Sequence, residues 1–173
     1  MGDHLQNQRE PQAPALLRNP AQLAAFGFGS GLSPWAPGTV GTVAAAVIYW
    51  YLLAPLPLWA YSAVILAASV GGIWLCGVAS RQLGVHDHPG IVWDEFAGLW
   101  VALWAVPASP LWLAIAFVVF RLLDIAKPWP VSVLDKDVGG GLGIMADDLV
   151  AGAMTCVTLH LAIAALSGAE ALT

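Results

Sequence analysis

The chain has 173 residues, of which 59% are hydrophobic and only 10% are charged. Soluble domains usually carry about 25% charged residues, so this composition cannot cover a water-facing surface and indicates an integral membrane protein. The six Lys and Arg residues are scattered over the whole chain, which argues against a nucleic-acid partner, and the net charge of −5 adds little. Cys76 and Cys156 both lie in apolar runs and are predicted to be free buried thiols.

The N-terminal region is polar and contains the stretch "REPQAPALLRNP". It lacks the basic start, short apolar core and small-residue cleavage site that are typical of a signal peptide. We therefore predict that residues 1–25 form a mobile polar tail. Residues 26–173 are expected to form a single helical membrane domain.

Five hydrophobic segments follow this tail. The stretch "APLPLW" at 54–59 places two prolines within three residues, which a continuing helix cannot accommodate. The prolines of "VPASP" at 106–110 divide the apolar run 97–120 in the same way, so two short helices are expected there. Each reaches only about 23 Å, less than the bilayer core of about 30 Å, and such spans require local thinning or sunken loops. The predicted spans are 39–53, 58–79, 92–106, 110–125 and 148–166.

The basic residues support five crossings. With five spans, every Lys and Arg falls on one side of the membrane, and the opposite turns at 54–57 and 107–109 contain no charge. This pattern places the basic side and the N-terminus in the cytoplasm. If 97–120 crossed only once, Arg121 and Lys127 would lie outside while Arg81 stayed inside. The predicted fold class is therefore all-α, a polytopic helical membrane bundle of about five short or full spans.

Acidic pairs lie at the predicted starts of two helices on the cytoplasmic face. Asp94–Glu95 precedes "FAG", and Asp147–Asp148 precedes the similar pattern "LVAG". Like charges packed against an apolar bundle repel each other and are costly unless something compensates them. A helix dipole would account for one acid but not for two at each of two helix ends. The pattern therefore favours a divalent cation such as Mg²⁺, which takes one or two carboxylates together with phosphate oxygens.

Basic residues and a glycine-rich segment accompany these acids. Arg121, Asp124 and Lys127 are spaced so that they share one helix face. Either they form a structural salt-bridge ladder, or the two cations hold a phosphate while Asp124 helps to hold metal. The segment "GFGSGLSPWAPGTVGT" at 27–42 offers glycines and the hydroxyls of Ser30 and Thr39 where a helix begins. That context suits anion binding, although a simple membrane-entry turn explains it equally well.

Four motifs together resemble the phosphatidylglycerophosphatase A family. They are "GFGSGLSPWAPGTVGT", "GVHDHPGIVWDEFAG", "FRLLDIAKPWP" and "GGGLGIMADDLVAG", in order from about Phe26 to Ile163. The resemblance implies a Mg²⁺-dependent lipid phosphatase that converts phosphatidylglycerophosphate into phosphatidylglycerol. Together with the hydrophobic segments and the one-sided basic residues, this predicts a multi-pass protein of the bacterial cytoplasmic (inner) membrane with a cytoplasmic active site. Trp35 stands where the family often has a basic residue before "APGT", and some relatives are soluble all-helical proteins.

The resemblance and the residue chemistry assign roles to particular side chains, while the oligomeric state is left open. A carboxylate nucleophile and an activated water both remain compatible with the sequence. Asp87 is expected to matter more than the two histidines that flank it in "HDH". The expected catalytic residues are Asp94, Glu95, Asp124 and Asp148; the expected metal ligands are Asp87, Asp94, Glu95, Asp147 and Asp148; and the expected substrate-binding residues are Ser30, Thr39, Arg121 and Lys127.

An alternative function is a small ion or solute transporter with membrane-edge carboxylates as its cation site. Two features of the sequence oppose it, because the acids gather on one side and no predicted span carries a charge at its midplane. A lipid phosphatase with a histidine nucleophile would need Arg-Pro and Ser-Gly-His motifs, and neither occurs in the sequence.

Overall fold

The computed structural model describes residues 19–85, 88–131 and 138–170, and every regular element within these ranges is helical. This confirms the predicted all-α class. The elements in chain order are α2 (Pro20–Ala25), η1 (Gly27–Leu32), α3 (Pro37–Ile48), η2 (Tyr49–Leu53), α4 (Leu58–Leu83), α5 (Trp93–Ala102), α6 (Pro110–Ala126) and α8 (Gly140–Glu170). Element η2 continues α3 as one wide helical turn, so the two form a single rod.

Prolines and capping residues determine where most helices begin. Pro37 and Pro110 occupy the first turns of α3 and α6, where a missing N–H costs nothing. The Ser109 side chain caps α6 by accepting a hydrogen bond from the backbone N–H of Trp112 at 3.2 Å. The predicted break at the second proline pair is confirmed. However, α5 ends at Ala102 rather than at residue 106, because the chain turns through Ala105 with φ of 55°.

The folded part of the chain begins earlier than predicted. Asn19 accepts hydrogen bonds from the N–H groups of Ala21 and Gln22, and Pro20 takes the first helical position, a standard start signal. The resulting helix α2 packs on α4 and buries Ala25 completely. The expectation that residues 20–25 belong to a mobile tail is therefore wrong. Residues 1–18 lie outside the described ranges.

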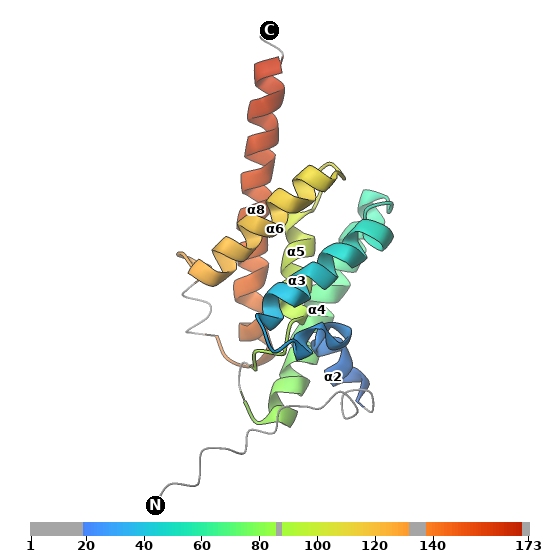
Figure 1. Ribbon diagram of the computed structural model, residues 1–173, viewed down its shortest axis with the longest axis vertical. Coiled ribbons are helices and arrows are strands. Elements are labelled where there is room, and N and C mark those ends of the chain that lie inside the picture. Colours follow the sequence, from blue (N-terminus) through green and yellow to red (C-terminus); the bar gives the residue numbers. More distant parts are fainter. Residues whose placement is uncertain (1–18, 86–87, 132–137, 171–173) are drawn as a thin grey trace, which may run out of the picture.

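Helix α5 forms the centre of the bundle. It packs against α3, α4, α6 and α8, and Figure 1 shows it enclosed by these four helices. Nearly all of its side chains are buried, including those of Phe96, Leu99 and Trp100. The Trp100 indole N–H donates to the carbonyl of Ala45 on α3 at 3.1 Å, which satisfies a polar group inside the core. The residues at the start of α5 are therefore held by helices on every side.

Two helices are long and apolar enough to cross a membrane, namely α4 and the stretch Gly140–Gly168 of α8. Only 28% and 22% of their apolar windows are buried inside the protein, whereas the core helix of a soluble protein would be mostly buried. In Figure 1 the C-terminal half of α8 projects beyond the other helices. Leu161 and Leu166 on this half are largely exposed. The α3–η2 rod (Pro37–Leu53) is apolar but shorter.

Cys76 is buried and Cys156 is half-buried, and neither forms a disulfide bond.

Candidate active site

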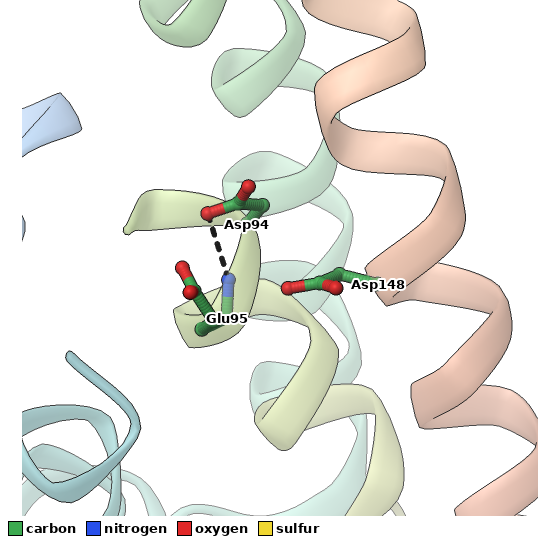
Figure 2. Close-up of side chains that lie close together, drawn as sticks. All are labelled: Asp94, Glu95 and Asp148. Carbon is green, nitrogen blue, oxygen red and sulfur yellow. Dashed lines mark hydrogen bonds between the residues drawn. The ribbon is translucent and has the colours of Figure 1, made fainter. Parts of the chain in front are cut away.

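Three carboxylates from two helices meet at the buried start of α5. Asp94 and Glu95 lie in the first turn of α5, and Asp148 comes from α8 on the opposite side (Figure 2). Each residue offers one oxygen that lies within 4.8 Å of those of the other two. Asp94 and Asp148 are only 8% and 3% exposed, and Asp94 Oδ1 accepts the Glu95 backbone N–H at 3.1 Å. The predicted acids are thus brought together, with Asp148 as the member from α8. The prediction that Asp147 and Asp148 lie at a helix start is wrong, because α8 already begins at Gly140 and has no acid in its first turn.

A basic residue and a fourth acid from α6 adjoin this cluster. The Arg121 guanidinium contacts Asp124 through Nη1 and Oδ2 at 2.5 Å, and the same nitrogen lies 3.7 Å from Glu95 Oε1. Asp124 also lies near enough to Asp148 for the two carboxyl groups to interact electrostatically. Arg121 Nε and Glu95 Oε2 are buried and have no hydrogen-bond partner in the described part of the chain. Buried polar atoms are usually satisfied, so these two mark a place where a ligand would supply the missing partners.

The start of α3 closes another side of the site. A Cβ atom on Gly38 would lie 2.2 Å from Glu95 Oε1 and 3.2 Å from Arg121 Nη2, so the helix backbone touches both side chains. The N-cap residue of α3, Ala36, has a left-handed φ of 45°, and no side-chain capping hydrogen bond to the first N–H groups occurs within the described part of the chain. Unsatisfied N–H groups at a helix start favour anions. Thr39 lies in this first turn and is half-buried.

Lys127 does not continue the helix face of Arg121 and Asp124 as expected. Helix α6 ends at Ala126, and Lys127 adopts a left-handed conformation with φ of 43°. This turn directs its Nζ to Oδ2 of Asp147, 2.8 Å away. The prediction that Arg121, Asp124 and Lys127 share one helix face is therefore wrong, because the helix ends before Lys127. Asp147 stands beside the three-acid cluster as the partner of a lysine rather than as one of its members.

Of the remaining predicted residues, Ser30 stands apart from this arrangement, and one residue was missed. The Ser30 hydroxyl donates to the Gly27 carbonyl at 2.8 Å, a local contact within η1. Asp87 lies outside the described residues. Gly38 was not singled out from the sequence, although the "APGT" stretch, with proline at a helix start followed by glycine, points to a backbone that another group approaches closely.

The donor set suits a hard divalent cation. Asp94, Glu95 and Asp148 present oxygen atoms only, and one guanidinium cannot neutralise three buried carboxylates together with Asp124. Repulsion between buried like charges and their loss of hydration are both unfavourable. A divalent cation would remove both costs, and Mg²⁺ prefers carboxylate oxygens with phosphate oxygens completing its coordination. The residues at this site therefore fit a Mg²⁺ ion.

Comparisons with known proteins give the chain a family. The family model described as Phosphatidylglycerophosphatase A matches residues 23–163. No solved structure matches the chain. A Phosphatidylglycerophosphatase A of Escherichia coli (strain K12) is 48% identical over 145 residues, covering 83% of this chain and 84% of the relative. One of Haemophilus influenzae is 40% identical over 145 residues, covering 83% of this chain and 89% of the relative. The match includes every described residue of the candidate site, and the chain belongs to the phosphatidylglycerophosphatase A family.

Proposed function

We propose that the protein is a Mg²⁺-dependent phosphatase of the membrane that hydrolyses the terminal phosphate monoester of phosphatidylglycerophosphate and releases phosphatidylglycerol. The single observation that carries this proposal is the cluster of Asp94, Glu95 and Asp148 within 4.8 Å, beside a buried arginine and an uncapped helix start. The relatives of Escherichia coli and Haemophilus influenzae described above bear the name of this activity. Cation-binding acids next to anion-binding donors are the parts that phosphoryl transfer requires.

Asp94, Glu95 and Asp148 would hold the metal ion, with Asp87 as a further candidate ligand. Bound Mg²⁺ would supply positive charge against the phosphate oxygens. Asp147 would act mainly through its ion pair with Lys127, which keeps this lysine at the edge of the site. Asp124 pairs with Arg121 and lies near Asp148, so it would orient the guanidinium between the basic and acidic halves.

The phosphate would lie between Arg121 and the start of α3. Asp124 and Glu95 occupy the Nη1 side of the guanidinium, and Nε has no partner among residues within the described ranges. The Nε and Nη2 edge is the fork that binds two oxygens of one phosphate. The N–H groups at the start of α3 and the Thr39 hydroxyl would complete the pocket. Ser30 would contribute through the backbone of its turn.

A proton must also be moved during hydrolysis. One carboxylate of Asp94, Glu95, Asp124 or Asp148 either attacks phosphorus itself or takes the proton from the attacking water. Arg121 stabilises the charge on the transferring group in both routes. Burial excludes bulk water and strengthens each of these interactions, because the local dielectric is low.

The lipid substrate explains why acids stand at the end of apolar helices. We place α4 and α8 across the bilayer, with the α3–η2 rod, α5 and α6 as shorter membrane segments, in the cytoplasmic membrane of a bacterium. Arg81, Arg121 and Lys127 then lie on the cytoplasmic side. The site lies at the depth of the headgroups, where a lipid phosphate reaches it. Part of the short segments would be covered by protein rather than lipid, as α5 is.

The test is phosphate release from phosphatidylglycerophosphate by the purified protein, with Mg²⁺ and with excess chelator. We expect turnover that depends on Mg²⁺, and a loss of at least about 10²-fold in kcat for Asp94→Asn, Glu95→Gln or Asp148→Asn. Thr158→Val is the matched control, because Thr158 is an exposed α8 residue whose hydroxyl bonds only to its own helix. Full activity in chelator, or in all three amide variants, would refute the proposed site, and transport without phosphate release would favour the transporter.

A further inference from the structure

Two glycines lie where α5 crosses α8. Gly98 follows Asp94 by four residues, and Gly152 follows Asp148 by four residues, so each glycine lies one helical turn from its acid. A Cβ atom on Gly152 would lie 2.2 Å from the Gly98 carbonyl oxygen. A Cβ atom on Gly98 would lie 2.7 Å from the Phe120 ring of α6 and 2.8 Å from the Asp148 carbonyl oxygen of α8. The two backbones are in direct contact, and neither helix has room for a side chain there.

This contact determines how far apart the carboxylates of the two helices lie. Packed helix axes are usually about 8–10 Å apart, and small residues at the contact permit a closer approach. An aspartate side chain is short. If the axes of α5 and α8 moved apart, the distance between the carboxylate oxygens of the two helices would therefore increase by nearly the same amount. The oxygens of Asp94, Glu95 and Asp148 can lie within 4.8 Å only while α5 and α8 remain this close.

We propose that Gly98 and Gly152 are positioning residues that hold the α5 and α8 carboxylates at the separation needed by a divalent cation. This inference rests on the proposed metal-dependent function. A methyl group at position 152 would meet a backbone carbonyl, which cannot swing aside as the end of a side chain can. The helices would have to separate by roughly 1 Å, whereas Mg²⁺ accepts its oxygens at about 2.0–2.1 Å in nearly ideal octahedral geometry.

The test is Mn²⁺ binding to the purified full chain, measured from the electron paramagnetic resonance signal of free Mn²⁺, below the unfolding temperature of every variant. We expect Gly152→Ala to weaken binding at least about tenfold, as loss of a metal-supporting contact commonly does. Two controls separate the effect of helix spacing from the effect of an added methyl group and from the effect of lost stability. Gly71→Ala makes the same change in a helix where nothing lies within 4 Å, and Leu159→Ala opens a cavity beneath a fully buried α8 side chain.

Gly71→Ala should bind Mn²⁺ as the wild type does. Leu159→Ala should lower Tm yet keep Mn²⁺ affinity within about twofold, because it destabilises α8 without separating the acids. Normal affinity in Gly152→Ala, or an equal loss of affinity in Leu159→Ala, would overturn the positioning role. If Gly152→Ala does not fold, Gly98→Ala, with its less severe backbone contact of 2.8 Å, is judged by the same criteria. Absence of Mn²⁺ binding by the wild type would instead refute the proposed metal site.

Discussion

Replacement of Gly38 by alanine should separate activity from stability in this protein. The new Cβ atom would lie 2.2 Å from Glu95 Oε1, whereas ordinary van der Waals contact begins at 3.4 Å. The carboxylate oxygen must therefore retreat by about 1.2 Å, the difference between these two distances. Glu95 can do so because only the end of a side chain moves. The backbone of α3 and the core around α5 remain as they are.

The Gly38→Ala substitution should weaken metal binding at the site, but it should leave the stability of the fold unchanged or slightly higher. A shift of this size removes Glu95 from the coordination of an ion whose oxygens lie at about 2.0–2.1 Å, so we expect Mg²⁺ dependence to weaken on the order of 10- to 100-fold. The new methyl group also approaches Arg121 Nη2 to 3.2 Å and narrows the phosphate pocket. Alanine is the better helix former by roughly 0.5–1 kcal/mol, so Tm should stay the same or rise slightly.

The assay is the Mg²⁺ concentration that gives half-maximal phosphate release from phosphatidylglycerophosphate, measured beside melting of the detergent-solubilised protein. Gly71→Ala serves as the control, because it makes the same helix substitution in open space. Gly38→Ala should need far more Mg²⁺ at an undiminished Tm, and Gly71→Ala should match the wild type. Wild-type Mg²⁺ dependence in Gly38→Ala would refute the contact between the start of α3 and the metal ligands. A large fall in Tm would show that Glu95 is not free to retreat.

Two further predictions concern the basic residues and the topology. Arg121→Lys loses the two-pronged fork, so kcat/KM should fall on the order of 10²-fold, a transition-state loss of about 2.7 kcal/mol, with little change in Tm. Lys127→Arg should be milder, and early melting of Arg121→Lys with normal turnover would instead make Arg121 structural. In a background lacking both native cysteines, Gln82→Cys and Trp129→Cys should resist an impermeant thiol reagent in intact cells, while Ala108→Cys should react. All three positions are exposed, so opposite labelling of Gln82→Cys and Trp129→Cys would contradict the shared cytoplasmic face.

Features that depend on local chemistry could be predicted from the sequence. Prolines at 55, 57 and 110 lie where helices end or begin because of their own ring geometry, and both helix breaks were predicted from the proline pairs. The end of α5 at Ala102 was not, because it precedes Pro107 by five residues. The two acidic pairs indicated a cation before any contact was known, because the unfavourable burial of like charges does not depend on their exact arrangement. Only Asp94 and Glu95 lie at a helix start, however, since α8 begins at Gly140, before Asp147 and Asp148. The helix start signal at Asn19–Pro20 is equally local, so the start of α2 could also have been predicted from the sequence.

Tertiary structure decided which of these groups meet. The sequence did not indicate that Gly38 touches Glu95 and Arg121, or that Lys127 leaves its helix and pairs with Asp147, twenty residues away. The same holds for the crossing of Gly98 and Gly152, which brings Asp148 rather than Asp147 into the cluster. Each of these contacts joins separate helices, and their separation and rotation depend on how all the side chains between them pack. Composition and hydrophobic spacing determine which segments become helices, but only close packing determines the distances between their polar groups.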